Sequence, residues 1–176
     1  MRLNLREIIE IPGGSVPFSQ ELDTALLDFP SVRAYTAPIT AEGKVVNTAG
    51  ILTLQGRLHT QMLCVCDRCG AEFPRTVDLD LHADITADAQ DDDPEVFTLD
   101  GDWLDVDEVL STCFILSMDT KCLCRPDCAG LCDRCGANLN LGPCRCQKPR
   151  DPRMAVLEQL LDNKTDEEEE AAHNSD

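Results

Sequence analysis

Cysteine is the residue type in this chain that is best suited to chemistry, and its spacing is regular. The pentapeptide Cys-Asp-Arg-Cys-Gly occurs at 66–70 and again at 132–136, and five more cysteines lie within 122–146. In a Cys-x-x-Cys-Gly turn, backbone N–H groups can point at the first thiolate, and glycine permits the left-handed residue that lets both sulfurs face one metal ion. The repeated pentapeptide is typical of zinc knuckles and predicts metal binding.

Two groupings of these cysteines into metal sites are compatible with their spacing. Residues 132–146 read Cys-x2-Cys-x8-Cys-x-Cys, which can close a four-thiolate site locally. The first knuckle then needs Cys124 and Cys128, with Cys122 as a substitute for Cys124. The rival grouping joins the two knuckles in one ribbon around a single metal. We favour the first grouping, which predicts two structural Zn²⁺ ions bound by Cys66, Cys69, Cys124, Cys128, Cys132, Cys135, Cys144 and Cys146.

The remaining candidate residues do not point to catalysis. A shell of four thiolates leaves no coordination position for water or substrate, so such sites build structure. We expect His59 and His82 on the solvent faces of strands, His173 in an acidic tail, and Cys64 and Cys113 packed on apolar faces. The sequence contains no phosphate loop, Ser-His-Asp set or nucleotide fingerprint. We therefore expect no catalytic residue, no enzyme activity and no small-molecule substrate.

Charge divides the chain into acidic and basic parts. The formal net charge is −18, and segment 78–108 has thirteen acidic residues and neither Lys nor Arg. Segment 162–176 has seven acidic residues and one Lys, whereas 121–153 has seven basic residues and three acidic ones. The basic side chains either contact phosphate or offset the charge of about −2 on a zinc ion with four thiolates. Candidates for RNA contact are Arg134, Arg145, Lys148, Arg150 and Arg153.

The elements that must position the first knuckle are two alternating strands. Residues 51–65 and 76–86 both alternate apolar and polar side chains, which predicts half-buried antiparallel strands with Cys66–Gly70 at the tip between them. Gly56 lies within the first of these strands, where it predicts a bend or a bulge. Weaker strand patterns lie at 2–6, 32–40 and 44–49.

The second half of the chain combines helices with the cysteine-rich segment. Asp105 can cap a helix over 106–118, and Asp151-Pro152 can begin another that ends near 162. Between them, we expect residues 119–150 to be organised by metal and 163–176 to form a disordered acidic tail. The expected fold class is α+β. An antiparallel, partly barrel-like sheet with a packed helix covers 1–118, and a zinc-ribbon-like appendage with the terminal helix covers 119–162.

Several strings of this chain together resemble the YceD family, the large ribosomal RNA subunit accumulation proteins. The resemblance reaches to about residue 162 and rests on Cys66-Asp67-Arg68-Cys69 after a strand, on Cys124-Arg125-Pro126-Asp127-Cys128 after a helix, on Gly130-Leu131-Cys132-Asp133-Arg134-Cys135-Gly136-Ala137-Asn138-Leu139-Asn140, and on Asp151-Pro152-Arg153-Met154-Ala155-Val156-Leu157. One departure lies in the helix, where Ser111-Thr112 and Met118-Asp119 stand in place of the acidic residues and the Leu-Pro ending of relatives.

The resemblance implies a role in the accumulation of 23S rRNA and hence in large-subunit biogenesis, without a known catalytic activity. It also implies two metal sites, with Cys124 and Cys128 joining the first knuckle. No run is long and apolar enough for a membrane span, and we expect a cytoplasmic protein whose surface near 125–153 faces rRNA or a large-subunit ribosomal protein. The alternatives are an adaptor that binds basic ribosomal proteins through its acidic face 78–108, and a thiol-based metal carrier or redox sensor.

Overall fold

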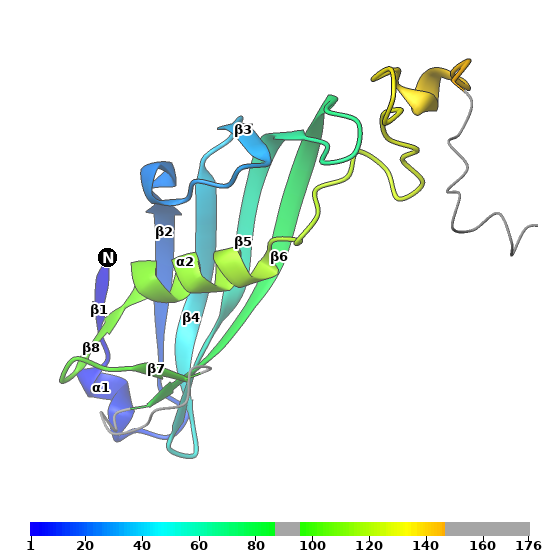
Figure 1. The fold of residues 1–176 in the computed structure, drawn as a ribbon. Coiled ribbons are helices and arrows are strands. Elements are labelled where there is room, and N and C mark those ends of the chain that lie inside the picture. The colour runs from blue at the N-terminus through cyan, green and yellow to red at the C-terminus, as the bar shows by residue number, and fades with distance from the viewer. Residues whose placement is uncertain (87–95, 147–176) are drawn as a thin grey trace, which may run out of the picture. The chain divides into compact units, whose positions relative to one another are not determined.

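The computed structural model describes residues 1–86 and 96–146 (Figure 1). The chain divides into two compact units, Met1–Gly130 and Leu131–Asp176. The predicted terminal helix at 151–162, the acidic tail, and the candidate contacts Lys148, Arg150 and Arg153 lie outside the described residues. Within those residues, none of the helices has the length and apolar character needed to cross a membrane.

The first unit is built on one large sheet, whose strand order is β2-β4-β5-β6-β7, with β3 also paired to β5. All pairings are antiparallel except that between β6 and β7, which is parallel. A separate antiparallel pair joins β1 to β8. The strands are β1 (Arg2–Asn4), β2 (Ser15–Leu22), β3 (Val32–Tyr35), β4 (Ile39–Thr48), β5 (Ile51–Val65), β6 (Glu72–Thr86), β7 (Val96–Thr98) and β8 (Trp103–Asp105).

The helix α2 (Val106–Ser117) lies across one face of this sheet (Figure 1). The Asp105 carboxylate accepts hydrogen bonds from the backbone N–H groups of Asp107 and Glu108, which caps the helix as its sequence predicts. The apolar stripe of α2 faces the strands, and Phe114 is fully buried with its ring edge against Phe29 at 5.9 Å between centroids. Burial of a side chain of this size stabilises the fold by ~1.5–3 kcal/mol.

The predicted elements are confirmed to different extents. Strand β5 and helix α2 lie where the sequence predicts them, and β6 begins at Glu72 instead of residue 76. The weaker patterns near 2–6, 32–40 and 44–49 correspond to β1, β3 and β4. The sequence did not predict β2, β7, β8 or the short helices α1 (Arg6–Ile9), η1 (Thr24–Leu26) and η2 (Leu139–Leu141). A mixed α+β architecture is present, but the barrel-like closure is not confirmed, because the path of paired strands in the described residues ends at β2 and β7.

The glycine in β5 has a different role from the predicted bulge. The register between β4 and β5 runs without a shift through the directly opposed pair Gly43 and Gly56. A Cβ atom on Gly56 would lie 2.4 Å from the carbonyl oxygen of Glu42, and one on Gly43 would lie 2.3 Å from that of Gln55. Both positions therefore require glycine because the two backbones approach too closely for a side chain.

We predict that Gly56→Ala destabilises the first unit by ~1–3 kcal/mol, since the added methyl group must push two paired strands apart. Gln55→Ala, at an exposed neighbouring position, should change the free energy of unfolding by less than about 0.5 kcal/mol. Urea unfolding followed by the fluorescence of the single tryptophan, Trp103, measures both. Equal midpoints for Gly56→Ala and the unmodified chain would contradict this account.

Candidate metal centres

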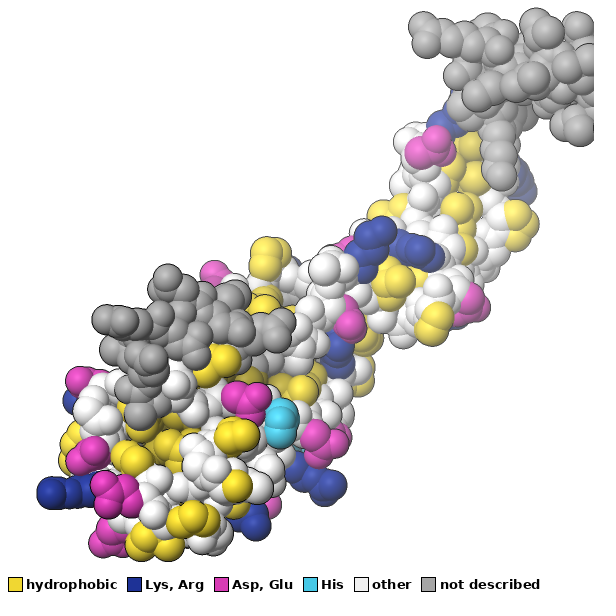
Figure 2. Space-filling model, turned by 90° about the horizontal axis from the view of Figure 1, so that it is seen from below, with side chains coloured by type: hydrophobic (Ala, Val, Ile, Leu, Met, Phe, Trp, Pro, Cys, Tyr) yellow, Lys and Arg dark blue, Asp and Glu magenta, His cyan; other side chains and the backbone are white. Residues whose placement is uncertain are grey.

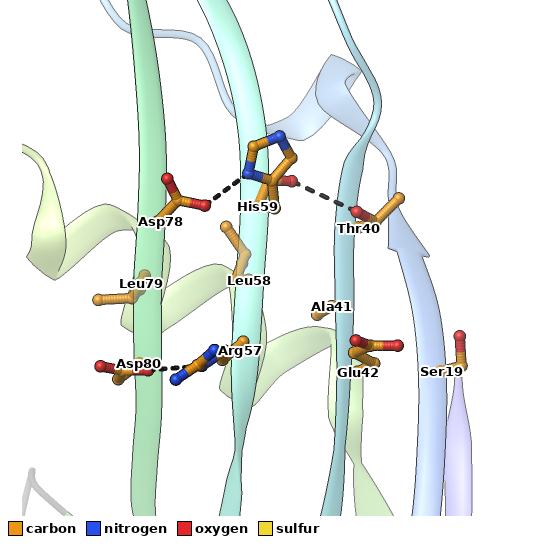
Figure 3. A pocket seen from close by; sticks show the side chains of 10 residues that line it. All are labelled: Ser19, Thr40, Ala41, Glu42, Arg57, Leu58, His59, Asp78, Leu79 and Asp80. Carbon is orange, nitrogen blue, oxygen red and sulfur yellow. Dashed lines mark hydrogen bonds and ion pairs between the residues drawn. The ribbon is translucent and has the colours of Figure 1, made fainter.

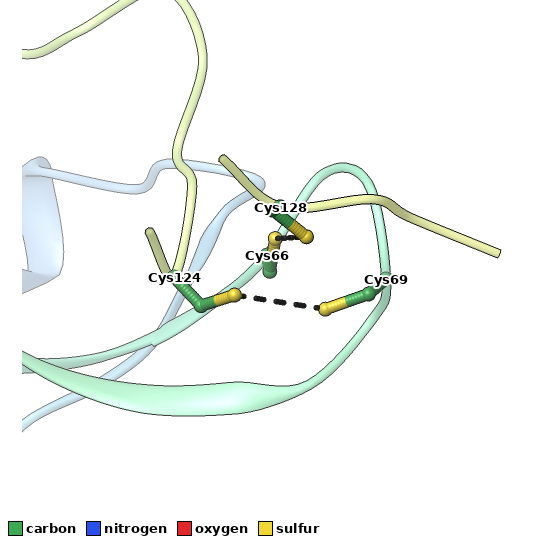
Figure 4. Close-up of side chains that lie close together, drawn as sticks. All are labelled: Cys66, Cys69, Cys124 and Cys128. Atoms are coloured by element: carbon green, nitrogen blue, oxygen red, sulfur yellow. Dashed lines mark hydrogen bonds between the residues drawn. The ribbon is translucent and has the colours of Figure 1, made fainter. Parts of the chain in front are cut away.

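The first group of cysteines forms at the tip of the β5–β6 hairpin. The tip provides Cys66 and Cys69, and the segment that follows α2 provides Cys124 and Cys128 (Figure 4). All four Sγ atoms lie within 4.8 Å of one another, and three of the four residues are buried. Helix α2 and the residues after it thus return the chain to the hairpin tip, as the favoured grouping requires.

The distances within this first quartet suit a metal shell. The Sγ atoms of Cys66 and Cys128 are 3.8 Å apart, as are those of Cys69 and Cys124. A disulfide would need about 2.05 Å. Zn–S bonds of about 2.3 Å in a tetrahedron place neighbouring sulfurs about 3.8 Å apart. The donor set and its spacing therefore fit a divalent ion bound by four thiolates.

Backbone hydrogen bonds favour a thiolate at the first cysteine of this knuckle. Burial raises the pKa of Cys66, but N–H groups of Cys124, Cys69 and Arg68 donate to its sulfur and lower the pKa to about 6. At Cys124, burial and the neighbouring sulfurs raise the pKa to about 12. Four ionised sulfurs at this separation repel one another, so the quartet needs a cation to be fully deprotonated.

The second quartet repeats this chemistry within the second unit. The Sγ atoms of Cys132, Cys135, Cys144 and Cys146 lie within 4.8 Å of one another. N–H groups of Cys135 and Arg134 donate to the sulfur of Cys132 and lower its pKa to about 7, whereas hydrogen bonding to Cys135 raises that of Cys146 to about 12. Cys135 is exposed, and Cys144 and Cys146 are half-buried. The second quartet is therefore more open to solvent than the first.

The two knuckles share one backbone conformation. The N–H of Gly70 donates to the carbonyl of Cys66 at 2.8 Å, and the N–H of Gly136 donates to that of Cys132 at 2.9 Å. The two glycines have φ angles of 68° and 70°, in the left-handed region that favours glycine. The repeated pentapeptide thus forms the same turn twice.

The side chains inside the first turn hold neighbouring segments in place. The Asp67 carboxylate accepts from the N–H of Cys122 at 2.6 Å and from the Ser31 hydroxyl at 2.9 Å. The Arg68 guanidinium donates to the carbonyl of Cys128 at 3.0 Å. These contacts hold the segment after α2, which contains Cys124 and Cys128, at the hairpin tip.

The corresponding side chains of the second turn face solvent. Asp133 and Arg134 are exposed, as is Arg145 between the last two cysteines. In residues 1–86 and 96–146, neither Arg134 nor Arg145 forms an ion pair or a side-chain hydrogen bond. The same dipeptide therefore holds neighbouring segments in the first copy, whereas in the second Asp133 accepts from the adjacent Cys132 thiol and Arg134 is unpartnered within the described residues.

The other cysteines and the histidines lie outside both quartets. Cys122 is buried, and its thiol interacts with Cys64 and Arg75, so it does not replace Cys124. Cys64 is in the core, where burial raises its pKa to about 11, and Cys113 is half-buried beside the core. Both histidines of the described residues, on β5 and β6, are exposed.

The face of the sheet away from α2 contains a polar cavity of about 570 Å³ between β2, β4, β5 and β6 (Figure 3). Asp80 pairs with Arg57 at 3.1 Å, and Asp78 contacts His59 at 2.6 Å. In the view of Figure 2, acidic and basic side chains are interspersed on the surface. The acidic residues of β6 point outward as predicted, and the Arg57 guanidinium offsets the charge of Asp80. The cavity depends on cross-strand register, which sequence reasoning did not provide.

A sheet crossed by one helix, with cysteine quartets in two compact units, defines a class of small protein organised around thiolate clusters. Residues 54–161 match the model of the family described as "Large ribosomal RNA subunit accumulation protein YceD", and the chain belongs to this family. The matched segment includes all eight cysteines of the two quartets.

Curated relatives are distant. The "Large ribosomal RNA subunit accumulation protein YCED homolog 1, chloroplastic" of Zea mays is 25% identical over 147 residues, which cover 65% of this chain and 50% of the relative. Uncharacterized proteins of Mycobacterium tuberculosis and Mycobacterium bovis are each 28% identical over 106 residues, covering 57% of this chain and 51% of the relative. The chain thus spans about half the length of the relatives it matches. No solved structure matches it.

We predict that Arg68→Ala and Arg134→Ala differ in effect although they change the same position of the pentapeptide. Loss of the Arg68 hydrogen bond should lower the free energy of local opening around the first quartet by ~1–2 kcal/mol. The alkylation rate of Cys128 should then rise by a factor of about 5–30. Arg134→Ala should leave the alkylation rates of Cys144 and Cys146 unchanged. Mass spectrometry of iodoacetamide-labelled peptides measures each rate. Similar acceleration in the two variants would show that the knuckles are equivalent and would refute the distinction.

Proposed function

We propose that this protein is a non-enzymatic factor that supports accumulation of large-subunit rRNA, with two structural zinc ions and a contact to RNA through its second unit. The observation that carries the proposal is the family match, because its description names large ribosomal RNA and its residues 54–161 include both quartets. The whole relatives are about twice as long as the matched part, so the role of this chain within ribosome biogenesis is part of the proposal.

The proposed metal ions are zinc because the donors are thiolates in closed sets of four. Soft thiolate donors in a tetrahedral arrangement select zinc or iron–sulfur clusters over hard cations. The proposed ligands are those predicted from the sequence, Cys66, Cys69, Cys124 and Cys128 in one site and Cys132, Cys135, Cys144 and Cys146 in the other. A closed shell supports a structural role, since zinc-bound water would need a vacant position.

We predict two zinc equivalents per chain after anaerobic purification with ample zinc, measured by mass spectrometry of the metal. Cys66→Ser and Cys132→Ser should each reduce the content to one equivalent, because one thiolate is lost from a different site in each variant. Cys113→Ser, outside both quartets, is the matched control and should retain two. A single equivalent in the unmodified chain would favour one shared ribbon site, and none would remove the metal proposal.

The proposed RNA contact uses the basic side chains of the second unit. Arg134 and Arg145 are exposed and unpartnered within the described residues, so each can neutralise a phosphate without first breaking an ion pair. Lys148, Arg150 and Arg153 extend this basic segment in the sequence. By contrast, Arg57 on the first unit is already paired with Asp80. Arg134 and Arg145 are therefore better candidates for phosphate contact than Arg57.

We predict that the protein binds fragments of large-subunit rRNA with an affinity that falls as salt rises. Arg134→Ala and Arg145→Ala should each lower the slope of log affinity against log salt by about 0.7–0.9, the loss of one phosphate contact. Arg57→Ala is the matched control and should leave the slope unchanged. Fluorescence anisotropy across a salt series measures all three.

The outcomes also separate the alternative functions. Absence of RNA binding at every salt concentration, with binding of a basic large-subunit protein that Asp80→Asn weakens, would favour the adaptor over RNA contact. Zinc that exchanges within seconds, or a reversible disulfide within a quartet, would favour a metal carrier or redox sensor. In a deletion strain, restoration of large-subunit rRNA by the unmodified chain and not by Cys66→Ser tests the cellular role itself.

A further inference from the structure

The two quartets differ in what covers them. In the first unit, the cysteines at the hairpin tip pack against Phe73 and Leu123. The side chains of Asp67 and Arg68 form hydrogen bonds to neighbouring segments. In the second unit, the equivalent turn borders a cavity of about 290 Å³. Within residues 1–86 and 96–146, the surroundings of the first knuckle are thus filled by protein side chains, whereas a cavity adjoins the second.

The walls of this cavity combine apolar surface with one charged rim. Leu131, Leu139 and Pro143 provide the apolar surface, and Asp133 and Arg134 form the charged part. Three cysteines of the second quartet complete the lining, so the cavity adjoins the proposed metal site directly: Cys132, Cys144 and Cys146. Leu131 has 46% of its surface exposed, so it is not part of the buried core. The volume lies at the small end of ligand sites, which begin near 300 Å³, so it suits one ring system and not a helix or an extended peptide.

We propose that this cavity receives one unpaired nucleobase of RNA, with an adjacent phosphate bound by Arg134. The inference rests on the proposed function and deepens it, since it assigns the RNA class as single-stranded or looped and identifies the site. The base lies against Leu131, Leu139 and Pro143, and the Asp133 carboxylate can accept a hydrogen bond from an amino group on the base edge.

Charge and shape favour a nucleobase over an apolar side chain of a protein partner. The guanidinium at the rim has no acid to neutralise it in the described residues, and a phosphate would supply that charge. Segment 131–146 has no aromatic residue, so stacking falls to the planar guanidinium and to apolar contact. Bases within a double-stranded RNA helix are stacked and cannot enter a cavity, whereas bases of loops and bulges can be splayed out.

The test compares a fluorescein-labelled hairpin RNA that has an unpaired loop with a fully paired duplex of the same length and charge. Zinc-loaded full-length protein should bind the hairpin about tenfold more tightly than the duplex. Leu131→Ser should remove that preference and leave duplex binding unchanged, because it affects only the base contact. Leu141→Ser changes a leucine that is 88% exposed and does not line the cavity, so it is the matched control and should retain the preference.

Three results would overturn the inference. Equal binding of hairpin and duplex, unaffected by Leu131→Ser but weakened by Arg134→Ala, would leave phosphate contact and the proposed function intact while removing the base site. Loss of one zinc equivalent or of thermal stability in Leu131→Ser, with the hairpin preference retained, would show that the chain fills the cavity itself. Absence of binding to either RNA would rule out the base site together with the proposed RNA contact. Rescue of rRNA levels in the deletion strain would then test the cellular role separately.

Discussion

Four sulfur atoms held within 4.8 Å of one another impose the main physical constraint on this protein. Backbone N–H groups of each knuckle can stabilise one thiolate, but the remaining sulfurs repel a second and third negative charge. A divalent cation removes this repulsion and replaces it with four bonds. In the first unit the arrangement also closes a loop between Cys66 and Cys128, which are 62 positions apart. The sulfurs therefore add a cation-dependent link between the hairpin tip and the segment after α2, beyond the hydrogen bonds and the ion pair that already join them.

Much of this arrangement follows from the sequence where one local rule dominates. Alternation over 51–65 predicts β5 because one face of the strand must be buried, and Asp105 predicts the start of α2 because its carboxylate satisfies free N–H groups. Strand β2 escapes prediction because Pro17 interrupts its pattern, which is tolerated at the edge of a sheet. The close approach of Gly43 and Gly56 also cannot be predicted from local sequence, because it depends on the register between β4 and β5.

The candidate sites show the same division between local and non-local information. Loop closure favours a self-contained quartet within 132–146, and this local argument leads directly to the grouping that the structure has. The different roles of Arg68 and Arg134 cannot be predicted in this way, because both lie in identical pentapeptides. What distinguishes them is the carbonyl of Cys128 in one case and solvent in the other. The same is true of the cavity beside the second turn, which depends on what the rest of the chain leaves uncovered.

Residues 119–122 are tied to the hairpin without any sulfur, through the ion pair of Asp119 with Arg75 and the hydrogen bonds of Asp67 with Cys122. Cys124 and Cys128 therefore stay near their partners even when the thiols are protonated. Among the described residues of the second unit, no hydrogen bond or ion pair joins 144–146 to the turn apart from those of the sulfurs. If both quartets hold zinc as proposed, scarcity of zinc would first dismantle the second unit, which we propose to contact RNA, while the sheet persists. The proposed contribution to ribosome production would then be conditional on the cell's zinc supply.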